Sequence, residues 1–315
     1  MSCNALARVD GTIAPPAALI RAPARRAEPA GSEPGIGAGI GAPVDFAVIG
    51  AMRAGTTLLH DILSRHPAIG MARMKETDYF IPSRNHARGP EWYRGQFRPD
   101  CRIRGDVSPN YTKARDFPGV PELMARIVPG IRLVYLVRDP VRRAMSQYRH
   151  SWLMGGIRET PVEIAGTPEY VSILEASCYA RQLDGYLRHF RQDQILVVDL
   201  DDLLSAPQPA LDRILAHVGA APMAVPDLGS LNRSDELARV PGPLLRLAHG
   251  PLRPVLTAAL GGRARGQLRR MLAWGPRRAP PEFPAALEER MRDELAGDAA
   301  RLRRMTGQGF ARWSV

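Results

Sequence analysis

The fold is decided by the stretch Asp45-Phe-Ala-Val-Ile-Gly50-Ala-Met-Arg-Ala-Gly55-Thr-Thr-Leu-Leu-His-Asp-Ile-Leu63. Within it, Val44–Ile49 is a short apolar run with β-branched residues, which predicts a buried strand. Thr56–Ser64 carries apolar residues at helical spacing and is followed by His66-Pro67, so it predicts a helix that stops there. Gly50–Gly55 is then a loop that joins a strand to a helix.

This loop has the composition of a phosphate-binding turn. Glycines let the backbone approach a phosphate, and the amides and positive dipole of the helix start hold the anion, with Thr56 and Thr57 as hydroxyl donors. The pattern resembles the Walker A sequence, but position 56 is threonine instead of lysine, and the cation lies inside the loop at Arg53. This difference disfavours an ATP- or GTP-dependent kinase or ATPase. The loop alone also leaves open a tight turn without a ligand.

Further apolar runs predict the rest of a sheet. Ile131–Val137 and Gln194–Val198 are expected as buried strands, and helices are expected at Pro121–Val128, Pro140–Trp152, Tyr170–Phe190 and Pro209–Val218. Apolar strands that alternate with helices indicate a parallel sheet covered on both faces. We therefore expect an α/β fold of three layers, P-loop-like, with a central parallel sheet flanked by helices.

A second anion site is predicted after the strand Ile131–Val137. Arg138 follows the carboxyl end of that strand, where ligands bind in open α/β sheets. Pro140 suits the first turn of the next helix, and Asp139 is its expected N-cap. Ser146 lies two turns into the helix and could face the same point. An arginine with a hydroxyl is a good clamp for a second phosphate.

Charge and composition divide the chain unevenly. Residues 1–43 are rich in Ala, Pro and Gly and predict a disordered leader, so the folded domain is expected at 44–315. The segment 237–281 holds nine arginines and no acidic residue, and so carries most of the net charge of +11. It could be a lid for an anionic saccharide, a surface for anionic membranes, or a solvated helical face.

Three further segments follow the loop stretch in order: Lys75-Glu-Thr-Asp-Tyr-Phe80, Gly105-Asp-Val-Ser-Pro-Asn-Tyr111 and Leu136-Val-Arg-Asp-Pro-Val-Arg-Arg-Ala-Met-Ser-Gln-Tyr148. Together they resemble the PAPS-dependent sulfotransferases, and most closely the branch that contains the heparan sulfate sulfotransferases and their bacterial relatives. The resemblance runs from about Asp45 to Gly219, with a weaker echo in the final helix and Trp313.

The resemblance implies a role for each matching residue. The loop would bind the 5′-phosphosulfate of PAPS, Arg138 and Ser146 would bind its 3′-phosphate, and Glu76 would be the general base for the acceptor. Tyr179 falls where the family often has a tyrosine near the nucleotide, and Arg233 could cover it. The implied donor-binding residues are Arg53, Ala54, Gly55, Thr56, Thr57, Arg138, Ser146, Tyr179 and Arg233, and the implied catalytic residues are Glu76 and Arg53.

Two positions depart from the family pattern. Where the family usually has lysine, this chain has Arg53, which can stabilise charge but cannot donate a proton to the leaving group. Val107 replaces a lysine that lies near the acceptor in the heparan sulfate branch, so acceptor recognition does not transfer.

Lys75 is expected to point to the opposite face from Glu76 if the segment is extended. Asp106 is a second candidate carboxylate.

The sequence thus predicts transfer of a sulfuryl group from PAPS to a hydroxyl or amine, with release of 3′,5′-ADP. A carbohydrate or lipid-linked acceptor is expected, together with a cytoplasmic location and a possible contact of 237–281 with a membrane surface. No metal is required, no histidine pair has ligand spacing, and no motif indicates nucleic-acid binding. A non-catalytic anion- or membrane-binding protein stays open as an alternative.

Overall fold

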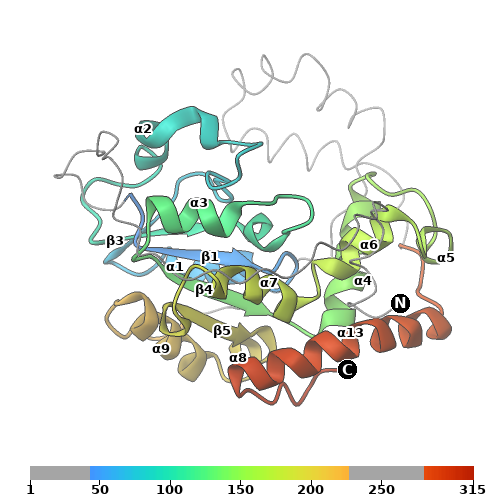
Figure 1. Cartoon of the computed structure of the whole chain (residues 1–315). Helices are drawn as coiled ribbons and strands as arrows, with labels where there is room; N and C mark the ends of the chain where they lie inside the picture. Colours follow the sequence, from blue (N-terminus) through green and yellow to red (C-terminus); the bar gives the residue numbers. More distant parts are fainter. Residues whose placement is uncertain (1–42, 227–279) are drawn as a thin grey trace, which may run out of the picture.

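A five-stranded, all-parallel sheet lies at the centre of the computed structural model, which describes residues 43–226 and 280–315 (Figure 1). The strand order is β2-β3-β1-β4-β5. The strands are β1 (Phe46–Gly50), β2 (Ile69–Met71), β3 (Ile103–Val107), β4 (Arg132–Val137) and β5 (Ile195–Asp199). The predicted α/β fold with a parallel central sheet is confirmed, and β2 and β3 are additions that the apolar pattern did not indicate.

Helices cover both faces of this sheet (Figure 1). Right-handed crossovers place α3 and α7 on one face and α1 and α9 on the other. The Tyr186 hydroxyl of α7 lies 4.0 Å from the Met124 sulfur of α3, in keeping with this pairing. The helices are α1 (Thr56–Leu63), α2 (Gly89–Arg94), α3 (Val120–Ile127), α4 (Pro140–Leu153), α5 (Pro161–Ile164), α6 (Pro168–Glu175), α7 (Tyr179–Leu187), α8 (Leu200–Ser205), α9 (Pro207–Val218) and α13 (Ala285–Thr306), with short 3₁₀ turns η1 (His86–Arg88), η2 (Pro109–Thr112) and η3 (Gln192–Gln194).

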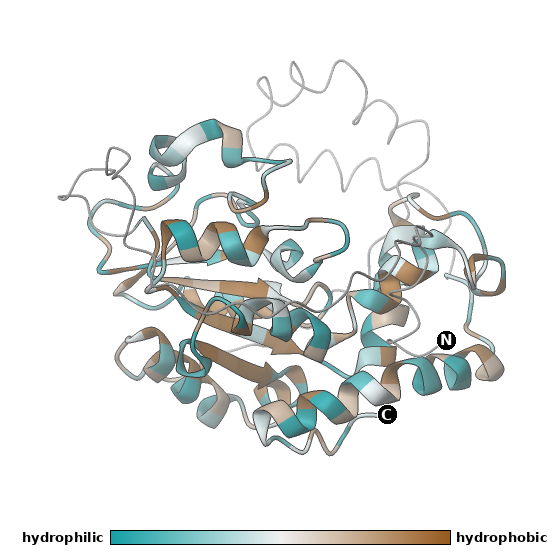
Figure 2. Cartoon of the chain, viewed as in Figure 1, coloured by the Kyte–Doolittle hydropathy of each residue, from teal (hydrophilic) through white to brown (hydrophobic). Residues whose placement is uncertain are grey.

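The core is formed where the central strands meet these helices. Every residue of β1 is buried, and so is every residue of β4 except Arg132. Figure 2 shows these strands as the most hydrophobic part of the chain, while the helices carry hydrophilic residues as well. Central strands of a parallel sheet are covered on both faces, so they need apolar side chains at every position. This is why β1 and β4 could be predicted from short apolar runs.

One predicted helix is wrong. Tyr170–Phe190 has helical periodicity throughout, yet the structure divides it into α6 and α7, with a break at residues 176–178. At the break, Arg143 donates to the Ile173 carbonyl, which in a continuous helix would accept the amide four residues on. Asp298 of α13 accepts the amides of Ala180 and Arg181, at 2.9 and 3.0 Å. Two charged side chains from distant elements thus replace the helical hydrogen bonds.

The carboxyl-terminal stretch is fastened across the ends of β4 and β5. The Trp313 indole N–H donates to Asp199 at 3.0 Å. The Ser314 amide donates to Asp139, whose other oxygen accepts the Arg142 amide at 2.8 Å and so caps α4 as predicted. None of the helices in the two described ranges is long and apolar enough to cross a membrane. Arg233 and nearly all of the arginine-rich segment 237–281 lie outside these ranges, as do residues 1–42.

Candidate active site

The loop between β1 and α1 adopts a conformation that depends on its glycines. Gly55 is the residue before α1 and has φ of 88°, a left-handed conformation that favours glycine. Gly50 is required for a different reason, since a Cβ there would lie 2.0 Å from the Thr112 hydroxyl of η2. Arg53 has φ of 69° and is not glycine, so the loop is held in a costly backbone shape at its cation.

The predicted phosphate ligands converge at this loop. The Arg53 Nε atom donates to the Ser146 hydroxyl at 3.1 Å, across 93 residues of sequence. Arg138 extends from the end of β4, and its Nη1 atom lies 3.5 Å from the Arg53 carbonyl oxygen. The first amides of α1, at Thr56 and Thr57, have no acceptor in the hydrogen-bond ladder of their own helix. Two guanidinium groups, a hydroxyl and a helix start therefore meet at the carboxyl edge of β1 and β4.

Tyr179 contacts the backbone of this cluster. Its ring is buried, and its hydroxyl donates to the Arg138 carbonyl at 2.8 Å. The Tyr179 hydroxyl thus fixes the backbone from which the Arg138 side chain extends. The ring also packs edge-on against Tyr135 of β4, with centroids 5.8 Å apart.

Arg143 of α4 lies directly against the loop, and the sequence analysis gave it no role. It is fully buried. Its guanidinium donates to the Met52 carbonyl of the loop at 3.2 Å and to the Gln147 side chain at 2.7 Å. Its other bonds go to Ser177 and to the Ile173 carbonyl, both at 2.5 Å. The available signal was its place within the Arg138–Ser146 motif, facing inward on α4.

Glu76, the predicted base, is accessible but is paired with its neighbour. Its side chain is 38% exposed, and its Oε1 atom accepts from Lys75 Nζ at 2.6 Å. The expectation that these side chains point to opposite faces is therefore wrong. Glu76 has φ of 65°, so the segment is not an extended strand and side chains do not alternate along it. The Glu76 amide donates to the Val107 carbonyl at 3.0 Å, which places the residue at the end of β3.

Asp106, the second candidate carboxylate, has no exposed surface. Its oxygens accept hydrogen bonds from four hydroxyls, those of Thr77 at 2.7 Å, Tyr111 at 2.8 Å, Ser108 at 3.0 Å and Tyr93 at 3.1 Å. Burial raises the pKa of Asp106, and the four donors oppose that rise. An acceptor molecule cannot reach this carboxyl, so of the two candidates only Glu76 is placed to meet one.

Comparison with known proteins assigns the family. The family model described as "Sulfotransferase domain" matches residues 43–225, which is more than half of the 315-residue chain. The chain belongs to the sulfotransferase family. The matched region contains the loop, Glu76, Arg138, Arg143 and Ser146.

Individual relatives of this sulfotransferase-family chain are heparan sulfate enzymes. Mouse heparan sulfate glucosamine 3-O-sulfotransferase 5 is 29% identical over 188 residues, which are 56% of this chain and 53% of that protein. Human heparan sulfate glucosamine 3-O-sulfotransferase 6 is 27% identical over 280 residues, 84% of this chain and 72% of that protein. Mouse bifunctional heparan sulfate N-deacetylase/N-sulfotransferase 4 is 28% identical over 56% of this chain and 22% of its own length. The chain thus spans about half the length of the first of these relatives.

The fold comparison agrees with the family. A solved sulfotransferase from Alicyclobacillus acidocaldarius superimposes with a TM-score of 0.62 and covers 86% of this chain and 99% of its own. At 20% identity the likeness concerns the fold alone. It supports the P-loop-like arrangement predicted from the sequence.

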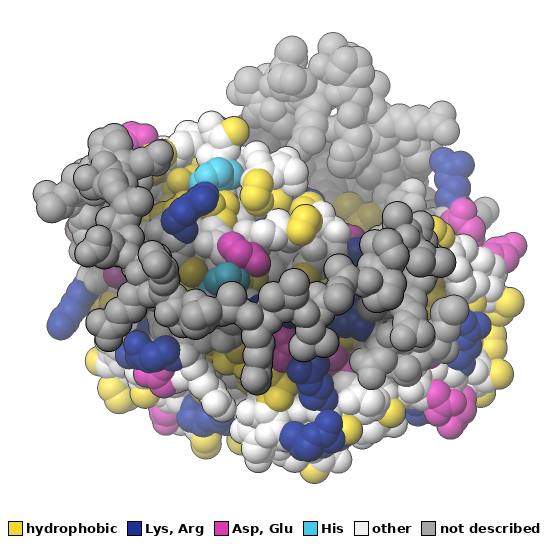
Figure 3. Space-filling view, in the orientation of Figure 1, with side chains coloured by type: hydrophobic (Ala, Val, Ile, Leu, Met, Phe, Trp, Pro, Cys, Tyr) yellow, Lys and Arg dark blue, Asp and Glu magenta, His cyan; other side chains and the backbone are white. Residues whose placement is uncertain are grey.

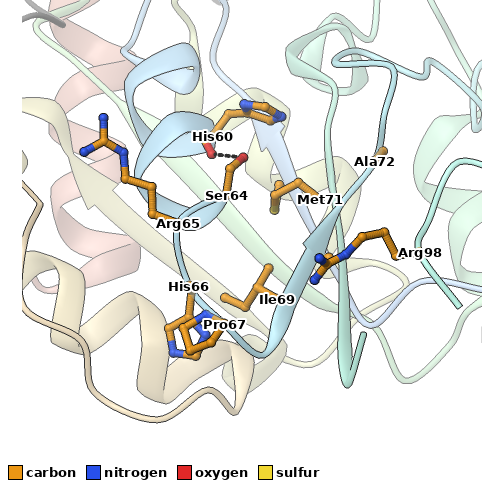
Figure 4. Close-up of a pocket in the computed structure, with 10 residues that line it drawn as sticks. His60, Ser64, Arg65, His66, Pro67, Ile69, Met71, Ala72 and Arg98 are labelled. Atoms are coloured by element: carbon orange, nitrogen blue, oxygen red, sulfur yellow. Dashed lines mark hydrogen bonds between the residues drawn. The ribbon is translucent and has the colours of Figure 1, made fainter. Parts of the chain in front are cut away.

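An open hollow of about 380 Å³ lies elsewhere on the protein, between the end of α1 and β2 (Figure 4). Its lining includes His60, Arg65 and Arg98, but none of the predicted donor ligands. His66 at its rim is used by the fold, since its ring bonds the Ala221 carbonyl and the Ala68 amide. Within the described ranges no three His, Cys, Asp or Glu side chains are grouped so as to hold a metal ion.

Proposed function

We propose that this sulfotransferase-family protein moves a sulfuryl group from PAPS to a hydroxyl or amine of a carbohydrate or glycolipid acceptor and releases 3′,5′-ADP. The observation that carries the proposal is the convergence of Arg53, Arg138 and Ser146 beside the start of α1. These residues come from three elements and offer cationic and hydroxyl donors at one edge of the sheet. A nucleotide with phosphate groups at both its 5′ and 3′ positions fits such a divided set.

In this proposal the loop and the start of α1 hold the 5′-phosphosulfate, while Arg138 and Ser146 hold the 3′-phosphate. The bond from Arg53 to Ser146 joins the residues proposed for the two phosphate groups. Arg53 stabilises the negative charge that develops on the leaving phosphate, as expected for a cation that keeps its proton.

The transfer step needs little covalent work from the protein. Glu76 takes the proton of the acceptor hydroxyl or amine, the acceptor atom forms a bond to sulfur, and the bond from sulfur to the phosphate oxygen breaks. The electron pair of that bond stays on the phosphate of 3′,5′-ADP. A well-placed general base contributes about 100- to 10,000-fold. Alignment of the three atoms contributes the rest, together with charge stabilisation.

The acceptor class is proposed from the relatives. Their names include both 3-O- and N-sulfotransferases of heparan sulfate, so a glucosamine-containing polysaccharide is the first acceptor to test. Family membership leaves no observation in favour of the kinase alternative. On the face seen in Figure 3, Lys and Arg side chains of the described residues are interspersed with Asp and Glu side chains.

The nucleotide half of the proposal is tested by calorimetry. The protein should bind 3′,5′-ADP at least about tenfold more tightly than ADP, because only the former carries the phosphate that Arg138 and Ser146 address. Equal affinities would overturn the assignment of the donor.

The transfer half is tested with labelled PAPS and desulfated heparan oligosaccharides. Glu76→Gln should lower transfer at least about 100-fold and keep the affinity for 3′,5′-ADP. Glu91→Gln is the matched control, since Glu91 is an exposed carboxylate of α2 paired with Arg94. If both variants keep wild-type transfer, Glu76 is not the base. Wild-type binding of 3′,5′-ADP without transfer to any acceptor would favour a non-catalytic anion-binding protein.

A further inference from the structure

Arg143 is a buried cation whose hydrogen-bond partners are all neutral. It has no exposed surface, and its guanidinium donates to two carbonyls, one amide side chain and one hydroxyl. None of these four acceptors is a carboxylate. Buried charges in proteins are as a rule paired with an opposite charge, because their desolvation is costly. The Arg143 guanidinium thus has hydrogen-bond acceptors, but none of them carries a negative charge, and this requires an explanation.

The surroundings of Arg143 place this charge under the nucleotide loop. One of its bonds goes to the Met52 carbonyl, inside the loop. Burial is the main cause that lowers the pKa of Arg143 to about 10; the charges of Arg138 and Arg53 act in the same direction, while Tyr179 and Tyr135 oppose it. At neutral pH the group stays protonated. Three cations thus surround one loop, with Arg143 on its inner side.

An anion bound in the loop would compensate this charge. Arg143 itself has no contact with solvent, so its attraction to the anion is screened less than that between two surface charges. The bond to Met52 also fixes the loop in the shape that receives the anion. The bond to Met52 acts on the 5′ site alone, since it holds the loop. The charge acts on both phosphate positions, because Ser146 lies one helical turn from Arg143 on α4 and Arg138 is also close to it.

We infer that Arg143 is a positioning residue and the buried counter-charge for the 5′-phosphosulfate group of the donor. This inference rests on the proposed function, and it adds a residue that acts on the donor without touching it. Arg143 also explains the break between α6 and α7, since its other bonds hold Ser177 and the Ile173 carbonyl in place. The break between α6 and α7 thus supplies two of the hydrogen-bond acceptors of Arg143.

The test separates the two phosphate positions of the nucleotide. Calorimetry on the full chain measures the affinities for 3′,5′-ADP, 5′-AMP and 3′-AMP. The proteins compared are the wild type, Arg143→Gln, Arg143→Lys and Gln147→Leu. Two unit charges about 8–10 Å apart at an effective dielectric of about 20 change affinity by about 20-fold. Arg143→Gln should therefore weaken binding of 5′-AMP and 3′,5′-ADP by at least about 20-fold, since these lose both the charge and the loop that the bond to Met52 holds. It should weaken binding of 3′-AMP by a smaller factor, since that nucleotide loses the charge alone. Arg143→Lys keeps the charge and should recover most of the loss.

The remaining variant is the matched control. Gln147→Leu removes one hydrogen bond from the same guanidinium and leaves the charge, so the ratio of 5′-AMP to 3′-AMP affinity should not change. A purely structural role of Arg143 predicts equal loss for both mononucleotides and no recovery by lysine, which would overturn the inference. If Arg143→Gln does not fold, Arg143→Lys decides through its affinities themselves: near wild-type binding of 5′-AMP supports the inference, and an equal loss for both mononucleotides overturns it. Failure of both to fold would make Arg143 a folding residue and also overturn it.

The result is independent of the donor assignment. A wild type without preference for 3′,5′-ADP over ADP contradicts the proposed function. The effect of Arg143 on 5′-AMP relative to adenosine can still be read in that case. Conversely, a clear 3′-phosphate preference with no effect of Arg143 on 5′-AMP contradicts only this inference.

Discussion

Substitution of Asp106 tests whether its carboxyl only stabilises the fold or also takes part in sulfuryl transfer. Its Oδ2 atom accepts from the hydroxyls of Thr77, Tyr93 and Tyr111, and its Oδ1 atom accepts from Ser108. All five side chains are buried. Asp106→Ala deletes the acceptors and keeps the four donors. Asp106→Asn keeps the shape and removes only the charge and one acceptor.

The contacts give the expected magnitudes. A buried donor without a partner costs about 1–3 kcal/mol, so four of them in Asp106→Ala cost at least about 4 kcal/mol, a large part of the about 5–15 kcal/mol that stabilises a typical domain. Asparagine can place its carbonyl at the Oδ2 position and keep three donors. Its amide then faces the Ser108 hydroxyl, which can rotate to accept. The weaker neutral bonds are offset by the removal of a buried charge, so Asp106→Asn should cost less than about 2 kcal/mol.

Urea unfolding followed by far-ultraviolet circular dichroism measures both costs. The same Asp106→Asn protein is then assayed for 3′,5′-ADP binding and for sulfuryl transfer, and it should keep both within about threefold. The reasoning is refuted if Asp106→Asn folds and binds the nucleotide but loses transfer by about 100-fold or more. In that case the buried carboxyl takes part in the chemistry, and Glu76 is not sufficient as a base.

Two further predictions concern stability. Gly55→Ala should cost about 2–3 kcal/mol by urea unfolding, since an alanine pays about 1 kcal/mol for the left-handed backbone and its Cβ would lie 2.5 Å from Leu200 Cδ1. Gly119→Ala has a similar φ with open space around it and should cost only about 1 kcal/mol; equal costs would contradict the clash. Burial raises the pKa of Asp199 from 3.8 to about 6, so between these values the folded state binds the proton and the unfolded state does not. Wild-type stability should therefore fall by up to about 3 kcal/mol relative to Asp199→Asn as pH rises from 4 to 7, and parallel pH profiles of the two proteins would contradict this.

The elements that the sequence predicted are those whose reasons are local. The strands β1 and β4 are continuous apolar runs, and the start of α4 has its proline and its capping aspartate next to each other in sequence. Arg138 was expected at the ligand-binding edge of the sheet because it follows the carboxyl end of a parallel strand, and Ser146 was expected to face the same point. In the structure Ser146 accepts a hydrogen bond from Arg53, so it lies beside the loop.

Strand β3 was missed because its reasons are distant. Its sequence, Ile-Arg-Gly-Asp-Val, has no apolar run. Arg104 is accepted in the sheet because it pairs with Asp45 at 3.0 Å. Gly105 is needed because a Cβ there would lie 2.2 Å from the Phe46 ring. Asp106 is accepted because four hydroxyls surround it. Ser108 and Tyr111 follow β3 closely, but Asp45, Phe46, Thr77 and Tyr93 lie well before it in the sequence, so no local pattern accounts for the strand.

The same physical cause explains what was wrong about the site. Periodicity predicted one helix through residues 170–190, and alternation predicted that Lys75 and Glu76 diverge. Both rules assume a regular backbone, helical in one case and extended in the other, and both fail where a buried charge or a left-handed residue interrupts it. Arg143 breaks the helix and supports the loop through the same guanidinium. The departures from local rules are therefore concentrated around the nucleotide loop and Glu76. Buried charges and left-handed residues lower the stability of such a site, and the packing of the surrounding core offsets this cost.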